Sequence, residues 1–507
     1  MRSKLSSSHS NSLSRSTSSS LIEREDSLTP WLLFSVAAIT VGSSFQLGFH
    51  IGCVNAPSAS ITRWIFRSHN ATFHQELSDG VVDLIWSAAV SLFAVGGMIG
   101  GILSGKLADN FGRKTTLLLL NFVVAIATAL MASAKFVDLY PLFMVGRFLI
   151  GFDAGVVAGV VPMYITEISP TSRRGMLGSA NQLVITVAIL VSQVVGLPQL
   201  LGNEERWPFI FALSVVPMLL QLVMLPFCPE SPKFNVLRRQ KDDTAEKDLR
   251  KLRREADVLE EIDAIYKEAD LSAFGAKTTG ITAMFRGFNR WPTIVTTVLM
   301  AAQQLSGINA AIFYSTRIFE RELKTNAVYA TLGLGGINVM QTLFSLYLVD
   351  RFGRRPLLLI GFAGMGLSSF GIFGSLIASE NEVEWAVYMT IAFMLTFVIA
   401  FATGPGSIPF FYATEIFGSN ERPSGVAIVS FTNWFFAFVV GIGFLQLNNV
   451  IGEWVFFFFA YVCCLTFVLL FAYVPETKNR SLEEIDYEME CRKPCFVEKK
   501  NLWGNLE

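Results

Sequence analysis

The residues best suited to bind a ligand form one short polar run, Gln303-Gln304-Leu305-Ser306-Gly307-Ile308-Asn309, directly after the apolar stretch Trp291 to Ala302. Gln303, Gln304 and Asn309 each carry an amide with two donors and an acceptor. Polar groups inside an apolar stretch are costly unless something satisfies them. On a helix, Gln304 and Asn309 would point about 140° apart, so the amides would cover a broad sector of the helix surface and not one narrow line. This lining suits a ligand covered in hydroxyl groups. The alternative is that these amides only join neighbouring helices. That explanation fits a single membrane Gln better than a cluster of amides.

The composition indicates that these amides lie inside a membrane. The chain has 507 residues, of which 52% are hydrophobic and 16% charged, whereas soluble domains average about 25% charged residues. Apolar runs of roughly 18 or more residues predict membrane spans. Twelve such runs lie near residues 30–53, 83–104, 115–135, 141–163, 176–200, 206–227, 291–316, 327–349, 357–378, 385–414, 423–445 and 452–474. We therefore predict an all-α polytopic membrane protein with twelve transmembrane helices.

The 385–414 run is too long for one regular helix and contains Gly404-Pro405-Gly406-Ser407-Ile408-Pro409. Each proline removes a backbone donor and clashes with the preceding turn, so we expect a break there. A broken helix at membrane depth is tolerated where it lines a cavity. We interpret this span and the 291–316 span as the gating helices; the alternative is a static proline kink.

Basic loops predict the orientation. The loops after the second, fourth, eighth and tenth spans carry Lys106, Arg113, Lys114, Arg173, Arg174, Arg351, Arg354, Arg355 and Arg422. The 228–290 segment adds thirteen Lys and Arg. The positive-inside rule makes these loops and both termini cytoplasmic. The 54–82 loop is then outside, and its sequon Asn70-Ala71-Thr72 predicts glycosylation of Asn70.

The chain repeats itself. Three elements recur at offsets of 241, 248 and 246 residues: Gly112 and Gly353 in basic turns, Glu167 and Glu415 before basic loops, and Glu230 and Glu476 after prolines. We therefore predict two homologous six-helix bundles, 30–227 and 291–474. A cytoplasmic linker with short helices, 228–290, joins them. Cytoplasmic tails, 1–29 and 475–507, flank them, and we expect the first, rich in serine, to be disordered.

Each half places acidic and basic residues at its cytoplasmic helix ends, where paired charges can lock neighbouring helices while that side is closed. A network that must break for the inner side to open is a bistable element. The alternative is that these charges only anchor the topology. The predicted gating network comprises Asp109, Arg113, Arg147, Glu167, Arg173, Asp350, Arg354, Glu415 and Arg422.

Several classes of function are not indicated. The six cysteines form no CxxC pair and no pattern with histidine that predicts a metal site. The linker carries no nucleotide-binding or catalytic motif, so we predict neither an enzyme nor an ATP-driven pump, and no cofactor. The expected partners are a small solute and the lipid bilayer, with no nucleic acid. We expect the tails to bind regulatory proteins or kinases.

The motifs together resemble one family. They are the two basic Gly turns, Pro229-Glu230-Ser231-Pro232, Gly146-Arg147-Phe148, Gln303 to Asn309, and Gly404-Pro405-Gly406. In this order they resemble the sugar-porter branch of the major facilitator superfamily, and most of all the animal facilitative glucose transporters, over roughly residues 30–480. The resemblance implies a plasma-membrane protein with the major facilitator fold. It implies that a monosaccharide, foremost D-glucose, moves down its gradient by alternating access.

The resemblance also implies which residues form the site. Positions matching the family's sugar contacts are Gln182, Gln303, Gln304, Asn309, Asn338, Asn433 and Trp434, and those matching its apolar wall are Ile185, Ile189 and Phe401. Amides can read hydroxyl groups, and aromatic faces can stack on the C–H face of a sugar ring. The chain departs from the family pattern at Phe313, Ala402 and Phe410, which leaves the preferred hexose open.

Two other functions stay open. Proton-coupled relatives carry an aspartate in the first span where this chain has His50, and facilitative members usually have asparagine. His50 and Arg147 lie at similar depths and could approach each other, which would favour a neutral imidazole. Asp153 is a second ionisable residue near mid-membrane. We favour neutral roles for both, and therefore facilitated diffusion. The remaining alternatives are a proton-coupled sugar symporter and a sensor that binds sugar without transporting it.

Overall fold

The computed structural model describes residues 28–74, 77–170, 173–254, 258–274, 280–323, 327–381, 383, 385–418 and 421–493. Within these ranges the regular structure is helical and contains no strand. Most of the predicted tail 1–29 and the end of the predicted tail 475–507 lie outside the described residues.

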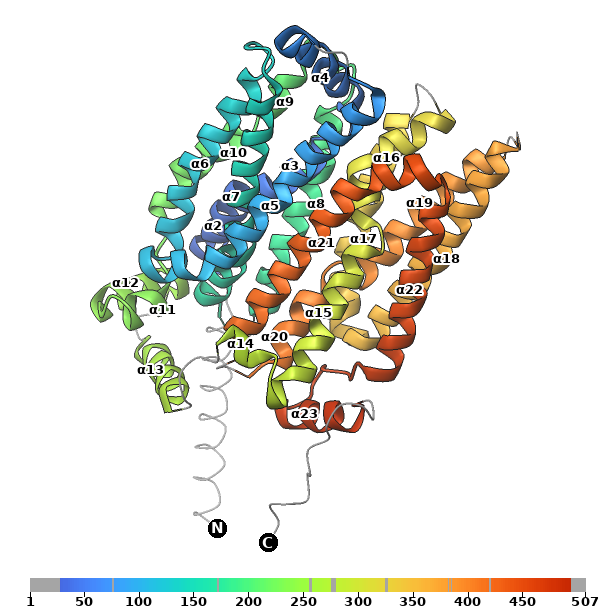
Figure 1. Cartoon of the computed structure of the whole chain (residues 1–507). Coiled ribbons are helices and arrows are strands. Elements are labelled where there is room, and N and C mark those ends of the chain that lie inside the picture. Colours follow the sequence, from blue (N-terminus) through green and yellow to red (C-terminus); the bar gives the residue numbers. More distant parts are fainter. Residues whose placement is uncertain are drawn as a thin grey trace, which may run out of the picture.

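The N-terminal half, residues 30–227, is a bundle of helices that run back and forth (Figure 1). Its elements are α2 (Pro30–Ile39), the π-helix η1 (Thr40–Ser44), α3 (Phe45–Gly52), α4 (Ser58–Phe73), α5 (Asp79–Phe111), α6 (Arg113–Ser133), α7 (Tyr140–Ile168), α8 (Arg174–Val195), α9 (Trp207–Ala212), α10 (Val215–Met224) and the 3₁₀-helix η3 (Leu225–Phe227). The first span is therefore one helical path, α2–η1–α3, with a π-helical turn in its middle.

The C-terminal half, predicted over residues 291–474, is also a bundle of helices and begins slightly earlier, at η4. Its elements are the 3₁₀-helix η4 (Gly287–Asn289), α15 (Arg290–Leu305), α16 (Ile308–Leu323), α17 (Ala327–Phe352), α18 (Arg354–Glu380), α19 (Ala386–Thr403), α20 (Ile408–Ile416), α21 (Arg422–Ile451) and α22 (Trp454–Tyr473). The halves meet where α5 packs against α21 and α8 packs against α17.

Short helices occupy the segments outside the two bundles. They are α11 (Pro232–Leu237), α12 (Asp242–Arg253), α13 (Leu259–Phe274) and α14 (Ile281–Met284) in the linker, and α23 (Leu482–Cys491) after the last span. Figure 1 shows these helices at one end of the bundle and α4 at the opposite end. The end with the linker is the one that the basic loops predict to be cytoplasmic, and we call the end with α4 the outer end.

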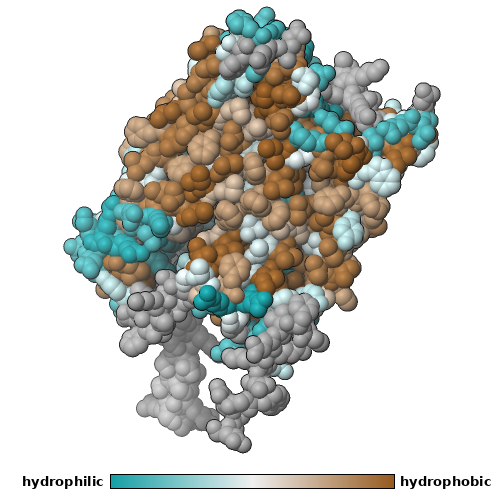
Figure 2. Space-filling model, in the orientation of Figure 1, coloured by the Kyte–Doolittle hydropathy of each residue, from teal (hydrophilic) through white to brown (hydrophobic). Residues whose placement is uncertain are grey.

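The helices have the length and composition of membrane spans. Eleven of those described are long and apolar enough to cross a bilayer. On the face shown in Figure 2, hydrophobic residues cover the middle of the molecule and hydrophilic residues gather towards its two ends. A hydrophobic band between polar ends is what a bilayer requires of a spanning protein. The prediction of a multi-pass, all-α membrane protein is confirmed.

The seventh span differs from its prediction. We expected one helix near 291–316, whereas the structure has two helices of 16 residues each, α15 and α16. Gly307 separates them with a positive φ of 92°, and a Cβ atom there would collide with the ring of Phe459. Glycine tolerates this conformation and this close approach. The predicted break of the tenth span is confirmed, because α19 ends at Thr403 and α20 begins at Ile408.

The sequence repeat has a matching geometry at the cytoplasmic end. Glu230 accepts hydrogen bonds from the first two backbone N–H groups of α6, at 2.9 and 3.0 Å. Glu476 accepts them from the first two N–H groups of α18, at 2.9 and 3.0 Å. A helix begins with N–H groups that have no partner within it, and a carboxylate satisfies them. Gly112 and Gly353 precede these helices with φ values of 95° and 91°, which leaves room for the carboxylates.

We predict that Glu476→Gln destabilises the C-terminal half. Burial raises the pKa of Glu476, but four backbone N–H donors together lower it below the ordinary 4.5. A carboxylate with a lowered folded-state pKa contributes stability above its unfolded pKa and loses it as the pH falls through the folded value. The variant should lose roughly 1–2 kcal/mol at pH 7, because charge-assisted hydrogen bonds become neutral ones. Thermal unfolding in detergent measures this loss.

The matched control for this prediction is Glu205→Gln, which neutralises an exposed glutamate at the outer end. It should leave the unfolding temperature unchanged. The difference between Glu476→Gln and the unaltered protein should narrow as the pH falls below 4.5, the ordinary glutamate value. A difference between the two proteins that stays constant as the pH falls well below 4.5 would contradict the capping role.

Candidate functional site

The polar run predicted to bind a ligand lies at the break between α15 and α16. Gln303 and Gln304 end α15 and are buried, with 3% and 7% of their surface exposed. Asn309 begins α16. The helix break therefore brings amides from two helices together in the middle of the C-terminal half.

The amide of Gln303 is fully engaged by other helices. Its Nε2 donates to the carbonyl oxygens of Pro405 and Gly406 at 2.5 and 2.9 Å. Its Oε1 accepts from Nδ2 of Asn433 on α21 at 2.9 Å. In a regular helix the carbonyl of Pro405 would accept from residue 409, but Pro409 has no N–H. Gln303 therefore supplies the donor that the break in the tenth span lacks.

A second amide pair lies beside the first. Nδ2 of Asn309 donates to Oε1 of Gln304 at 2.6 Å, which joins α16 to α15 across the break. Asn433 also places its Nδ2 3.7 Å from the sulfur of Met300. The pairs Gln303–Asn433 and Gln304–Asn309 are connected through the adjacent residues Gln303 and Gln304 of α15, and we refer to these four residues of α15, α16 and α21 as the amide group.

The other predicted polar residues sit on the helices that join the halves. Gln182 is half-buried on α8, and Asn338 is buried on α17, the helix that packs against α8. Among the described residues, the structure gives neither side-chain amide a hydrogen bond. Ile185 and Ile189 follow Gln182 on α8, and Phe401 lies on α19 just before the break. Contacts between these residues and the amide group remain a prediction.

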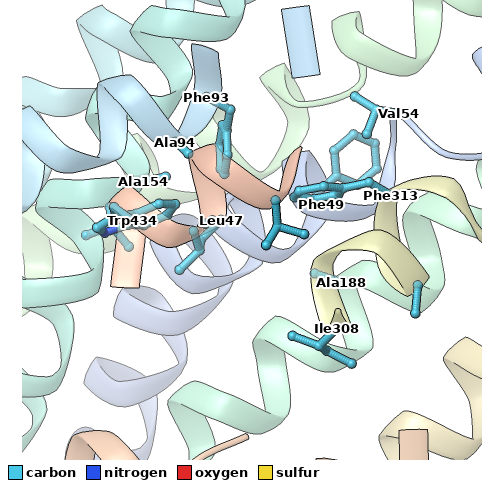
Figure 3. Packing of buried hydrophobic residues seen from close by; sticks show 14 of the residues in the cluster. Leu47, Phe49, Val54, Phe93, Ala94, Ala154, Ala188, Ile308, Phe313 and Trp434 are labelled. Atoms are coloured by element: carbon cyan, nitrogen blue, oxygen red, sulfur yellow. The ribbon is translucent and has the colours of Figure 1, made fainter. Parts of the chain in front are cut away.

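Trp434 connects the site to the N-terminal half. Its ring meets that of Phe93 on α5 edge to face, with centroids 5.7 Å apart, and Figure 3 shows the two side chains together. A Cβ atom on Gly97 would lie 2.5 Å from the indole of Trp434. The missing side chain at Gly97 therefore lets α21 approach α5 closely at the depth of the site.

The predicted gating charges pair within each half. Nε of Arg113 on α6 lies 2.8 Å from the carboxylate of Glu167 on α7. Nη2 of Arg354 on α18 lies 2.7 Å from the carboxylate of Glu415 on α20. Ser231 and Thr477 donate to these two glutamates, each at 2.5 Å. Because each pair joins helices of one half, the pairs hold each half together at its cytoplasmic end.

The remaining members of the predicted network have other surroundings. Asp109 lies 3.6 Å from Arg113 and 2.9 Å from Arg238 of the linker. Arg173 and Arg422 lie at the starts of α8 and α21. The backbone of Asp350 belongs to α17, but its side chain lies outside what the structure describes.

Arg147 lies apart from the cytoplasmic network. Its Nη1 donates to the backbone carbonyl of His50 at 3.0 Å, and its guanidinium lies 4.7 Å from the centre of the Phe93 ring. The predicted approach of His50 and Arg147 is confirmed, although the bond goes to the backbone and not to the imidazole. His50 and Arg147 are fully buried, and Asp153, further along α7, is 3% exposed.

Our sequence reasoning missed the polar residues that join the two halves at the outer end. Four residues of the N-terminal half, Asn55, Asp83, Ser87 and Gln199, form hydrogen bonds to the C-terminal half. Asp83 carried a usable signal, because a carboxylate inside an apolar segment needs a partner. Its partner, Arg317, is 234 residues away, and the sequence gives no means of pairing the two.

Comparisons with known proteins find a matching family model and similar relatives. A family model described as "Sugar (and other) transporter" matches residues 36–489. The chain is 48% identical to "Facilitated glucose transporter protein 1" of Caenorhabditis elegans, with 94% of each chain covered. It is 39% identical to the mouse "Solute carrier family 2, facilitated glucose transporter member 3", with 90% of this chain and 92% of the relative covered.

Solved structures share the fold. The xylose transporter XylE of E. coli, in a partially occluded inward-open conformation, is similar with a TM-score of 0.75 and 24% sequence identity. The match covers 90% of this chain and 100% of the transporter. The predicted major facilitator fold is confirmed.

Proposed function

Since the chain belongs to the family of sugar (and other) transporters, we propose that it carries a hexose, foremost D-glucose, across the membrane by facilitated diffusion. The observation that carries this proposal is the group of four amides formed by Gln303, Gln304, Asn309 and Asn433. The name of the relative with 48% identity supports the choice of glucose. The family consists of transporters and not of enzymes.

The sugar binds at the amide group of the C-terminal half, close to where Trp434 contacts Phe93 of the N-terminal half. Hydroxyl groups both donate and accept hydrogen bonds, so they can replace the bonds that the amides make to one another. Gln182 and Asn338 add amides from the two helices at the junction of the halves. Trp434 offers an aromatic face, and Ile185, Ile189 and Phe401 form the apolar wall. Each of these residue roles is one that the resemblance to the sugar-porter family implies for this chain.

The bonds of Gln303 couple the sugar to the gate. The same amide that would bind a hydroxyl group also holds the carbonyls of Pro405 and Gly406, at the break between α19 and α20. A sugar that draws Gln303 away leaves those carbonyls without their donor and loosens α20. α20 carries Glu415, whose pairing with Arg354 holds the cytoplasmic end. Sugar binding thereby shifts α20 within the C-terminal half, and this movement biases the equilibrium between the open and closed cytoplasmic sides.

The basic loops support the orientation, and the resemblance supports the location. We propose that the protein lies in the plasma membrane, with both termini and the linker helices in the cytoplasm. Asn70 is exposed on α4 at the outer end, where it accepts a glycan. The tails are the places where regulatory proteins or kinases bind.

We predict that Gln303→Leu weakens sugar binding. The variant removes a hydrogen-bonding partner of the sugar and leaves polar groups unpaired, which costs about 1–3 kcal/mol, or roughly 5- to 150-fold in Kd. Calorimetric titration of the purified protein with D-glucose measures the change. The matched control is Gln341→Leu, which removes another amide bond to the same broken span, from Nε2 to Oγ1 of Thr403 at 2.8 Å. If the unaltered protein, Gln303→Leu and Gln341→Leu bound D-glucose with equal affinity, Gln303 would not be part of the sugar site.

Uptake into liposomes tests the transport itself. D-glucose should enter proteoliposomes saturably and stop at equal concentrations on both sides, and L-glucose should serve as the control that does not enter. An imposed proton gradient should leave the final level unchanged, because we assign neutral roles to His50 and Asp153.

Two results would overturn this assignment. Accumulation above equilibrium that collapses with a protonophore, and disappears in His50→Asn or Asp153→Asn, would establish a proton-coupled symporter. Binding of glucose without saturable uptake would establish a sensor.

A further inference from the structure

We propose that Asp83 and Arg317 form a charged latch that holds the outer end of the transporter closed. The proposal rests on the proposed function in one respect, namely that the two halves part at the outer end during transport. Asp83 belongs to α5 in the N-terminal half, and Arg317 belongs to α16 in the C-terminal half. The latch therefore spans the surface along which the halves must separate.

The carboxylate of Asp83 is held on both of its oxygens. Oδ1 lies 2.5 Å from Nη2 of Arg317. Oδ2 accepts from Nδ2 of Asn449 on α21 at 3.3 Å. Only 12% of the Asp83 side chain is exposed, whereas 36% of the Arg317 side chain is exposed. One carboxylate of the N-terminal half thus binds two helices of the C-terminal half, with its arginine partner at the edge of the solvent.

The contact between α5 and α21 continues along the face of α5 that carries Asp83. Ser87 follows Asp83 by four residues, so both lie on one face of α5. Its Oγ accepts from Nε2 of Gln446 on α21 at 3.5 Å. Ser91 comes four residues later, and a Cβ atom on Gly441 of α21 would lie 2.7 Å from its Oγ. The α5–α21 contact therefore closes along two helical turns below the ion pair.

A second polar contact holds α16 directly. Nδ2 of Asn55, just after α3, donates to the carbonyl of Ile312 at 2.7 Å and to Oγ of Ser315 at 2.7 Å. Its Oδ1 accepts from the backbone N–H of Thr316 at 3.1 Å. Ile312 and Thr316 are an i, i+4 pair, whose backbone groups bond to each other in a regular helix. Asn55 thus binds the backbone of the helix that carries Arg317.

An apolar contact lies beneath these bonds. Figure 3 shows Phe313 of α16 near Phe49 and Val54 of the N-terminal half, and all three belong to one buried cluster. Opening the outer end must break this contact, the neutral bonds of Asn55 and the ion pair together. Of these, the ion pair is charge-assisted, and such bonds are about twice as strong as neutral ones. Its loss should therefore shift the equilibrium between closed and open outer ends the most.

The latch is tested by the access of a thiol reagent from outside. Ser91 is 1% exposed and lies on α5 below the latch, so a cysteine placed there by Ser91→Cys reacts when the outer end opens. A membrane-impermeant maleimide is added to intact cells that express this reporter protein, and the labelling rate is measured. Protein that keeps Ser91 gives the background from the native cysteines.

Added to the reporter, Asp83→Asn or Arg317→Gln should raise the labelling rate about five- to tenfold, the range of a modest coupling energy. The exchanged pair Asp83→Arg with Arg317→Asp should bring the rate back towards that of the reporter. Arg63→Ser is the matched control, because it removes an outer ion pair, to Glu204 at 2.7 Å, that lies within one half. It should leave the rate unchanged.

Two results would overturn the latch. One is that Asp83→Asn and Arg317→Gln, each added to the Ser91→Cys reporter, are labelled no faster than the reporter alone. The other is a raised rate that the exchanged pair does not lower, because the ion pair would then not be the cause. The assay needs no sugar, so a failure of the latch is distinguishable from a failure of glucose transport, which the liposome assay measures separately.

Discussion

A helix that breaks at membrane depth leaves backbone carbonyls without donors, and the surroundings offer little water to replace them. The structure meets this constraint with a side chain. Gln303 donates to the carbonyls of Pro405 and Gly406 at the break of the tenth span, and it stands next to the break of the seventh span at Gly307. Both broken spans are therefore joined through one amide. The group that lets the helices break is also the group best placed to recognise a sugar.

The two ends of the molecule are held by different kinds of contact. At the cytoplasmic end, Arg113–Glu167 and Arg354–Glu415 pair helices within one half, and Glu230 and Glu476 cap the starts of α6 and α18. At the outer end, Asn55 and Asp83 bind the opposite half. Each half is thus stabilised internally, while the contacts between the halves can be exchanged. This distribution suits two bodies that move against each other about a site in the middle.

Much of this architecture could be predicted from the sequence. Hydrophobic length predicts the spans, and the spacing of the Gly turns and glutamates predicts the repeat, because these features are local or recur in order. The break at Gly404–Pro409 could also be predicted, since proline cannot donate the bond that a helix needs. The break at Gly307 could not, because a single glycine inside a predicted span is compatible with a continuous helix until its contact with Phe459 is known.

The pairings across the structure could not be predicted either. The amides of the site were identifiable by type, but the bond from Gln303 to Pro405 joins residues 102 apart. Its partner is a backbone carbonyl, which carries no signal in the sequence. In the sequence, Asp83 and Arg317 are each a single charged residue at the end of an apolar run. Their pairing depends on how the two halves pack, which tertiary structure alone determines.

A sugar that binds by replacing the internal bonds of the amide group must separate Gln303 from Asn433. A structure of the protein with D-glucose bound, determined by electron cryomicroscopy, would show this change. We expect a sugar hydroxyl group between Gln303 and Asn433, with their direct bond, 2.9 Å long without sugar, broken. A glucose molecule bound elsewhere, with that bond intact and Gln303 still on the carbonyls of Pro405 and Gly406, would contradict this expectation.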